Sequence, residues 1–236
     1  PLLRGTLVRR YKRFLADVVL DSGEAVVAHC ANSGSMLSVD TPGAEVWVSP
    51  ARNPERKLRY TWELIRIGDA LVGINTQHPN RLAAEAVAAG AIPELAGYSL
   101  VRREVKYGRN SRIDLLLEAD GRPSCYVEVK NVTMRRDPIG PAEFPDAVTA
   151  RGAKHLDELA AMVAQGHRAA MLFLVQRTDC CRFAVAADID PVYAAGLARA
   201  RAAGVETLCY GCRLSPLEIT LDRPIPLELQ GAAGVG

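Results

Sequence analysis

The sequence has no hydrophobic run long enough to cross a membrane. Its longest fully apolar stretch, residues 169–175, has seven residues, whereas a membrane-spanning helix needs about 20. The chain does not open with the basic and then apolar segments of a secretory signal. We therefore expect a cytoplasmic protein with no membrane partner. With 49% hydrophobic and 24% charged residues among 236, the composition also excludes a disordered or collagen-like chain.

Cysteine is scarce, at six residues, and a cytosolic chain of this length does not need disulfides to fold. Cys209 and Cys212 form a lone CxxC pattern, which together with the adjacent Cys180 and Cys181 would supply four thiolates for zinc. Structural zinc sites usually take each ligand pair from a tight turn, but residues 205–213 have the pattern of a strand. Ordinary buried thiols are therefore the favoured interpretation, and zinc is the alternative.

Positive and negative charge nearly balance, with a formal net charge of +2, but the basic residues are bunched. Residues 1–13 contain five basic residues and no acid, and residues 52–59 contain four that face only Glu55. Such clusters are the electrostatic footprint expected of contacts with a DNA backbone; an ordinary solvated face is the alternative. The residues of these clusters predicted to bind DNA are Arg9, Arg10, Lys12, Arg13, Arg56, Lys57 and Arg59.

The first third of the chain has the pattern of a small β-barrel. Strand-like runs occupy residues 6–20, 25–30, 44–48, 58–67 and 70–75, with turn signals at 32–34 and 41–43. Five or six short strands in about 75 residues predict a barrel, which we place at residues 1–78 as a nucleic-acid-binding domain. Several aromatic residues lie among the basic clusters and either stack on bases or fill the core: Tyr11, Phe14, Trp47, Tyr60 and Trp62.

Residues 79–236 have the pattern of a mixed α/β domain. We expect helices at 81–89, 149–165 and 191–203, and strands at 99–107, 112–118, 125–132, 169–176 and 205–213. A long polar loop is expected at 133–148. Helices that are interspersed with strands in this order predict layers of helix packed on a mixed sheet.

The most specific local feature is Asp114, followed fourteen residues later by Glu128 and Lys130. Strand side chains alternate between faces, so Glu128 and Lys130 point away from the apolar Val127 and Val129. Ile113, Leu115 and Leu117 are expected on the face opposite to Asp114. A hairpin of this length would bring Asp114 beside Glu128. Two close carboxylates repel each other unless a cation joins them.

Mg²⁺ or Mn²⁺ suits such a pair because Mg²⁺ takes oxygen ligands, often one or two carboxylates with water and phosphate. The Val129 carbonyl is a candidate third ligand. Lys130 would stabilise developing negative charge or position an attacking water. Together these groups are the minimum equipment for phosphodiester hydrolysis. A strand with a charged outer face is the alternative.

Further candidates lie on neighbouring elements. Glu85 is on the helix that precedes the sheet, and Glu104 is on the first strand of the triplet, where it could align with Asp114. On helix 149–165 the apolar stripe is predicted at 152, 156, 159, 160 and 163, with Arg151 and His155 on its shoulder. From there Arg151 or His155 could touch the scissile phosphate. For each of these residues a surface or packing role is the alternative.

The chain resembles the sugar fermentation stimulation protein family along nearly its whole length. The resemblance is carried by 5–18 (GTLVRRYKRFLADV), 29–36 (HCANSGSM), 56–64 (RKLRYTWEL), 79–82 (PNRL), 104–108 (EVKYG), 111–114 (SRID), 126–133 (YVEVKNVT) and 144–147 (FPDA). Two departures lie in the barrel: Ala31 stands where the family usually has Pro, and Ser33 where it often has Thr. Both leave the carboxylate site untouched.

The resemblance implies an N-terminal OB-type barrel and a C-terminal restriction-endonuclease-like domain of the PD-(D/E)XK fold. Asp114, Glu128 and Lys130 match the central motif of that fold, and Glu85 matches the acid often found on its first helix. The resemblance also implies DNA binding and a role in regulating sugar (maltose) metabolism.

Combining both lines, we expect a DNA-binding protein with a Mg²⁺- or Mn²⁺-dependent nuclease site and little sequence specificity. The predicted catalytic residues are Asp114, Glu128, Lys130, Glu85, Glu104 and His155. The predicted metal ligands are Asp114, Glu128, Val129 and Glu85, and Arg151 is predicted to bind DNA. The alternative is a non-catalytic DNA-binding regulator of maltose metabolism genes. Self-association into a homo-oligomer is left open.

Overall fold

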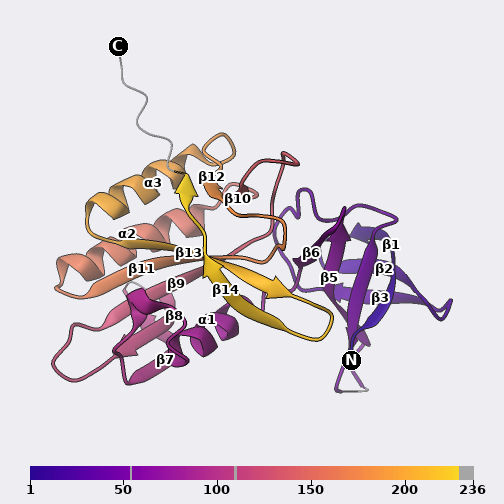
Figure 1. Cartoon of the computed structure of the whole chain (residues 1–236), viewed down its shortest axis with the longest axis horizontal. Coiled ribbons are helices and arrows are strands. Elements are labelled where there is room, and N and C mark those ends of the chain that lie inside the picture. The colour runs from indigo at the N-terminus through magenta and orange to yellow at the C-terminus, as the bar shows by residue number, and fades with distance from the viewer. Residues whose placement is uncertain (54, 109–110, 229–236) are drawn as a thin grey trace, which may run out of the picture.

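The computed structural model describes residues 1–53, 55–108 and 111–228. Two main bodies lie side by side along the long axis of the molecule (Figure 1). A β-barrel at one end is built from the first part of the chain. A sheet flanked by helices forms the other end, and its final residues 229–236 lie outside the described part.

In the described residues, the first sheet contains six strands: β1 (Leu3–Tyr11), β2 (Leu15–Leu20), β3 (Ala25–Cys30), β4 (Glu45–Pro50), β5 (Tyr60–Ile67) and β6 (Ala70–Gly73). Their order is β3-β2-β1-β4-β5-β6, and a parallel pairing of β3 with β5 closes the first five into a barrel. Apolar side chains that alternate along these strands fill the interior, including Leu7, Val18, Ile65 and the fully buried Trp62. The predicted barrel is therefore present.

The second body is a six-stranded sheet ordered β14-β13-β11-β9-β8-β7. Its strands are β7 (Leu100–Tyr107), β8 (Ser111–Glu118), β9 (Cys125–Val132), β11 (Arg168–Val175), β13 (Glu206–Leu214) and β14 (Ile219–Pro224). The helices are α1 (Pro79–Ala88), α2 (Ala150–Ala164) and α3 (Pro191–Ala202), with a 3-10 turn η1 (Pro93–Leu95). β11 is parallel to β9 and β13, and β8 is antiparallel to β7 and β9. The sheet is mixed, as predicted.

The continuous apolar strand β11 divides its side chains between two cores. Met171 and Phe173 pack with Leu156 of α2 and Leu197 of α3. Ala170, Leu172 and Leu174 pack on the opposite face, in a cluster that contains Leu82 of α1. That second cluster also includes Trp47 and Leu64 of the barrel, so a shared apolar boundary holds the two bodies together.

Local signals in the sequence account for the start of two helices. The hydroxyl of Thr149 accepts a hydrogen bond from the backbone N–H of Gly152 at 3.0 Å and caps α2. The carboxylate of Asp190 accepts one from the N–H of Tyr193 at 2.8 Å and caps α3. Such caps satisfy backbone donors that have no partner within the helix.

Several elements differ from the sequence predictions. The run 6–20 is two strands joined by a turn in which Lys12 and Arg13 have positive φ angles. The predicted loop at 133–148 contains β10 (Ala142–Phe144), which pairs with β12 (Phe183–Val185). β12 in turn pairs with β15 (Leu227–Glu228). These strands and β14 were missed because they are short or lack strict alternation, so that their pattern does not differ from that of a loop.

The face predicted for one residue of β8 is also wrong. Leu115 and Leu117 pack on the α1 side as a pair, but Ile113 packs on the side of α2 and α3. The register between β7 and β8 passes from Arg103–Leu115 to Val105–Ile113 without pairing Glu104 and Asp114. Glu104 has a φ of +54°, and this left-handed residue interrupts the regular ladder beside Asp114.

The cysteine pattern does not form a zinc site in the described ranges. Cys209 and Cys212 lie on β13 but pack into the two different cores, on opposite faces of the sheet. Burial raises the pKa of both thiols, which disfavours the thiolate form that zinc requires. The interpretation as buried thiols therefore holds for this pair. Separately, none of the helices in the described ranges is long and apolar enough to cross a membrane.

Candidate active site

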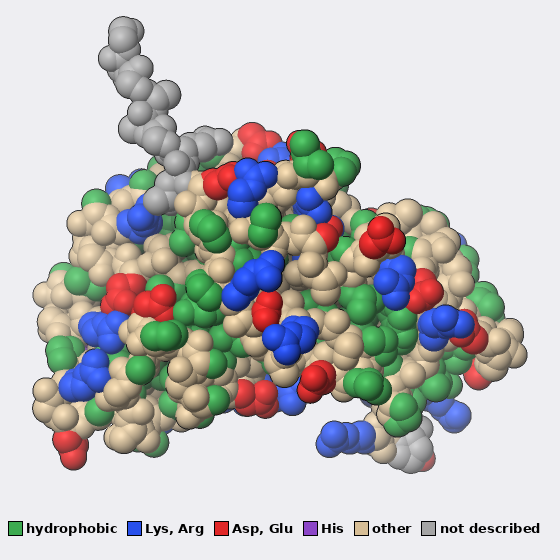
Figure 2. Space-filling model, in the orientation of Figure 1, with side chains coloured by type: hydrophobic (Ala, Val, Ile, Leu, Met, Phe, Trp, Pro, Cys, Tyr) green, Lys and Arg blue, Asp and Glu red, His purple; other side chains and the backbone are tan. Residues whose placement is uncertain are grey.

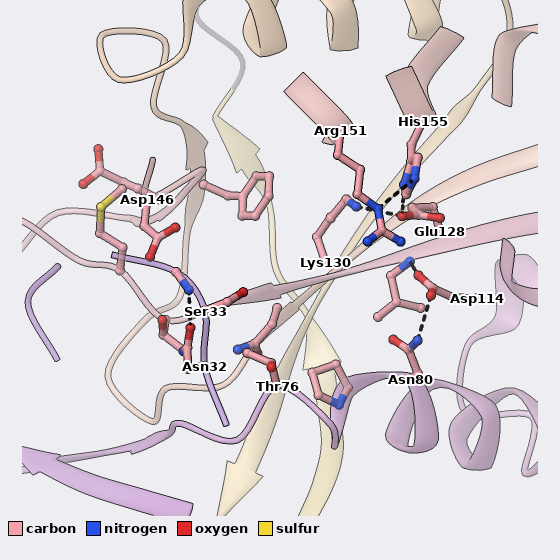
Figure 3. Close-up of a pocket in the computed structure, with 18 residues that line it drawn as sticks. Asn32, Ser33, Thr76, Asn80, Asp114, Glu128, Lys130, Asp146, Arg151 and His155 are labelled. Carbon is pink, nitrogen blue, oxygen red and sulfur yellow. Dashed lines mark hydrogen bonds and ion pairs between the residues drawn. The ribbon is translucent and has the colours of Figure 1, made fainter. Parts of the chain in front are cut away.

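A cavity of about 350 Å³ opens where the barrel meets the second domain (Figure 3). One wall is the barrel loop that contains Asn32, Ser33 and Gly34, and the opposite wall comes from β8, β9 and α2. Thr76, on the segment that connects the two bodies, and Asn80, in the first turn of α1, complete the floor. The predicted residues Asp114, Glu128, Val129, Lys130, Arg151 and His155 all line this cavity.

Asp114 projects from β8 and has both carboxylate oxygens occupied. Oδ2 accepts the backbone N–H of Val129 at 2.7 Å, and Oδ1 accepts the side-chain amide of Asn80 at 2.7 Å. Burial raises the pKa of Asp114 to about 6, and the negative charge of Glu128 adds to the rise. The hydrogen bonds from Val129 and Asn80 and the charge of Lys130 offset it only in part.

Glu128 lies on β9 and is 2% exposed. Its Oε1 is 2.7 Å from Nζ of Lys130 and also contacts Nδ1 of His155. Burial by itself would raise the pKa of Glu128, but the hydrogen bond from His155 and the charge of Lys130 outweigh it and hold the pKa below its usual value. The second oxygen, Oε2, is buried and has no hydrogen-bond partner among the described residues.

His155 is buried on the side of α2 that faces the sheet, although the sequence placed it on the shoulder of the apolar stripe. Nε of Arg151 donates to its Nε2 at 3.4 Å. The other ring nitrogen, Nδ1, contacts Oε1 of Glu128. The chain Arg151–His155–Glu128 thus orients the carboxylate from above, as Figure 3 shows.

The donor set fits an oxygen-preferring divalent cation. The cavity offers the Asp114 and Glu128 carboxylates, and Mg²⁺ is commonly held by one or two carboxylates with water and phosphate oxygens. A cation there would provide a partner for the buried Oε2 of Glu128 and would favour the ionised form of Asp114. A site built from side chains alone is not available, since no group of three or more His, Cys, Asp or Glu in the described ranges is placed to hold a metal.

Two predicted acids lie outside the cavity lining. Glu85 is on the exposed side of α1, with 60% of its side chain exposed, 3.6 Å from Arg81. Glu104 is exposed on β7 and reaches the site only indirectly, because the amide of Asn80 that binds Asp114 also donates to Glu104 at 3.1 Å. Val129 uses its backbone N–H to hold Asp114.

The basic residues of the barrel divide into those with protein partners and those without. Arg9 pairs with Asp17 at 2.7 Å, and Nη1 of Arg56 donates to Thr61 at 3.0 Å. The guanidinium of Arg10 donates to the backbone carbonyls of Arg13, Asn32, Gly34 and Ser35. Over the described ranges no side-chain partner is found for Lys12, Arg13, Lys57 or Arg59. On the face of the molecule that Figure 2 shows, arginines and lysines are interspersed with acids rather than gathered in one patch.

Sequence reasoning missed three parts of the site. Asn80 is a neutral residue that carries no charge signal, although it lies in the PNRL motif. The barrel loop 32–34 lies 70 residues or more from the predicted catalytic residues of the sheet, the first of which along the chain is Glu104. Asp146 fixes that loop to the second domain, because its carboxylate accepts hydrogen bonds from the Ser35 hydroxyl and the Met36 N–H, both at 3.1 Å. In the sequence, the signal for Asp146 was its position in the FPDA motif at residues 144–147.

Comparisons with known proteins agree with this architecture. A family model described as the SfsA N-terminal OB domain matches residues 8–74, and one described as the sugar fermentation stimulation protein RE domain matches residues 77–218. The predicted fold, an OB-type barrel followed by a restriction-endonuclease-like α/β domain of the PD-(D/E)XK type, is confirmed.

Relatives match over nearly the whole chain. A sugar fermentation stimulation protein homolog of Rhodospirillum rubrum is 64% identical, covering 96% of this chain and 97% of the relative. A homolog of Rhodospirillum centenum is 65% identical, with 97% of each covered. A solved structure of Pyrococcus furiosus SfsA in complex with Ca²⁺ superposes with a TM-score of 0.87 at 26% identity, covering 97% of this chain and 96% of that one.

Proposed function

The chain belongs to the sugar fermentation stimulation protein family, and on that premise we propose that it is a metal-dependent nuclease that hydrolyses phosphodiester bonds in DNA. The observation that supports the proposal most strongly is the convergence of Asp114, Glu128 and Lys130 in one cavity. A surface that only binds DNA has no need to bury two carboxylates beside each other, because their mutual repulsion costs free energy.

The metal proposed for this site is Mg²⁺ or Mn²⁺, held by Asp114 and Glu128, with the Val129 carbonyl as a further ligand. The Pyrococcus furiosus relative was solved with Ca²⁺, which also prefers oxygen ligands. When bound, such a cation polarises a phosphoryl oxygen and activates water. We leave Glu85 out of the ligand set because its side chain faces solvent and does not line the cavity.

The remaining residues are assigned from their positions. Lys130 lies at the cavity with its ammonium held by Glu128, where it would orient an attacking water and stabilise charge that develops on the phosphate. Arg151 is exposed on α2 and lines the cavity, so its free N–H groups can bind a non-bridging phosphate oxygen. His155 is buried and acts as a positioning residue, since it contacts Glu128 rather than open space.

Incubation with labelled single- and double-stranded DNA tests the proposal. We expect wild-type protein to cleave DNA with Mg²⁺ or Mn²⁺ and to stop when EDTA is added, and we expect Asp114→Ala to be inactive under all conditions. If the wild-type protein binds DNA but does not cut it with either metal, the result would instead support a non-catalytic DNA-binding regulator.

A further inference from the structure

A second cavity adjoins the proposed active site. Its volume is about 650 Å³, and it shares Ser33, Gly34, Phe144 and Asp146 with the first cavity. The lining continues outward to Arg10 and Arg13 of the barrel and to Val148 and Thr149 at the start of α2. The two cavities therefore form one groove that leads from Asp114 and Glu128 to the β1–β2 turn.

The floor of this groove is held in shape by the protein itself. Arg10 donates to the carbonyls of Asn32, Gly34 and Ser35, so it positions the loop between the two cavities. A Cβ on Gly34 would lie 2.7 Å from Oδ2 of Asp146, so only glycine allows the loop to approach that carboxylate so closely. Because both charged groups are occupied, neither Arg10 nor Asp146 is the main ligand for a substrate.

Arg13, in contrast, offers a charge to the groove. It is exposed, lines the second cavity and has no side-chain partner over the described ranges. Its backbone has a φ of +63° and its carbonyl is tied to Arg10, so the turn that carries the side chain is fixed. An unpaired guanidinium beside a groove is suited to a phosphate group.

The next residue supplies an aromatic surface. Phe14 is 44% exposed, although large apolar side chains are usually buried. Its ring stacks on His29 of β3, with 6.5 Å between centroids and 29° between planes. Burial lowers the pKa of His29, and the charge of the nearby Arg56 lowers it further, which keeps the imidazole neutral. The pair is a flat, uncharged platform that follows Arg13 directly in the chain and has the charge of Arg56 near His29.

We propose that a single DNA strand follows this groove and continues over Phe14, which is next to Arg13 at the β1–β2 turn although it does not itself line either cavity. In this arrangement Arg13 binds a backbone phosphate and Phe14 stacks on a base, and the substrate is therefore DNA with an unpaired segment. The inference rests on the proposed function, because the strand is taken to lead to the Asp114–Glu128 site at which the groove ends. Bases in a duplex are stacked on each other and are not available to Phe14, whereas an unpaired strand offers phosphates and base faces in alternation. Glu128, nearly buried in the cavity wall, is also reached more readily by one strand than by a duplex.

Binding measured without cleavage tests the path. The probe is a fluorescein-labelled oligothymidylate of about 12 nucleotides, within the range of one OB fold, titrated in EDTA at several salt concentrations. We expect Arg13→Ala to reduce the slope of log affinity against log salt by about 0.7, the value for one lost phosphate contact on a single strand. We expect Phe14→Ala to weaken binding roughly five- to a hundredfold, as for the loss of one base stack.

Two matched variants control for general effects. Arg213 is an exposed arginine paired with Asp222, and Val19 is an exposed apolar residue of the barrel; neither lines the groove or belongs to the β1–β2 turn at its end. Arg213→Ala and Val19→Ala should bind the probe like the wild type. Unchanged binding by Arg13→Ala and Phe14→Ala, or an equal loss in the two controls, would overturn the path. A duplex of equal length that binds as tightly as the single strand would overturn the unpaired substrate.

The outcome is separable from that of the proposed function. If the protein never cleaves DNA but the groove variants lose binding, the nuclease proposal fails and the path stands. If the protein cleaves DNA but the Arg13 and Phe14 variants bind normally, the nuclease proposal stands and the path fails.

Discussion

The side-chain amide of Asn80 donates to Oδ1 of Asp114 at 2.7 Å. Asn80 lies in the first turn of α1, directly after the segment that joins the barrel to the second domain, so this bond connects the start of the helix to a proposed metal ligand. The same nitrogen donates to Glu104. Asn80 therefore holds the Asp114 carboxylate in a fixed orientation and favours its ionised form.

Removal of this donor should weaken metal binding in a pH-dependent way. In Asn80→Ala the pKa of Asp114 is expected to rise further, and Mn²⁺ affinity should fall about fivefold near neutral pH, equivalent to about 1 kcal/mol for one hydrogen bond. The loss should be larger at pH 6 than at pH 8, because a proton then competes more strongly. Calorimetric titration at both values measures this, and equal losses at the two pH values would contradict the assigned role.

The raised pKa of Asp114 predicts the pH profile of metal binding in the wild type. The metal binds the ionised carboxylate, and this group becomes protonated as the pH falls through about 6. Affinity for Mg²⁺ or Mn²⁺ should therefore be constant above pH 7 and fall about tenfold per pH unit well below 6. Titrations between pH 5 and pH 8 test this. A profile that stays flat down to pH 5 would show that Asp114 does not bind the metal.

Lys130 is predicted to act on the reaction rather than on DNA affinity. Lys130→Ala should lose on the order of 3 kcal/mol of transition-state stabilisation, or about a hundredfold in rate, as when another oxyanion-stabilising donor is removed. Binding of the oligothymidylate probe should change little. Lys106→Ala, which removes an exposed lysine of β7 outside the cavity, is the control. Wild-type cleavage by Lys130→Ala would mean that this lysine has no catalytic role.

Arg10 is predicted to stabilise the fold. Arg10→Ala leaves the carbonyls of Asn32 and Gly34 without their partly buried donor, and we expect it to lower the free energy of unfolding by about 1–3 kcal/mol. Arg9→Ala removes an exposed pair with Asp17 and should have little effect, because exposed ion pairs contribute little. Urea unfolding of both variants measures the difference. Equal stability of the two would show that Arg10 does not support the loop.

The central part of the site could be predicted from the sequence because it depends on local geometry. Alternation along a strand places Glu128 and Lys130 on one face, and a short hairpin brings Asp114 close to them, as the structure shows. The closed barrel follows from several short strands separated by turn residues. Both inferences need only spacing and side-chain type, and they do not depend on how distant parts of the chain meet.

Contacts between distant segments could not be predicted. Nothing in the run Arg9, Arg10, Lys12 and Arg13 distinguishes the arginine that binds four carbonyls from the one that faces a groove, because three of those four carbonyls lie more than 20 residues away. Glu85 likewise lies on the predicted helix, but the rotation of that helix on the sheet turns Asn80 toward Asp114 and Glu85 toward solvent. Helix packing, which single-residue patterns do not specify, decides which of the two reaches the site.

The rate of DNA cleavage by two single variants tests the central claim most directly. Asp114→Asn keeps the shape of the side chain but removes its charge, and Glu85→Gln makes the same change on the solvent side of α1. With Mn²⁺ and single-stranded DNA under single-turnover conditions, we predict no detectable cleavage by Asp114→Asn and the wild-type rate for Glu85→Gln. Cleavage by Asp114→Asn at the wild-type rate, or no metal-dependent cleavage by the wild-type protein, would contradict the assignment of this cavity as a metal-dependent nuclease site.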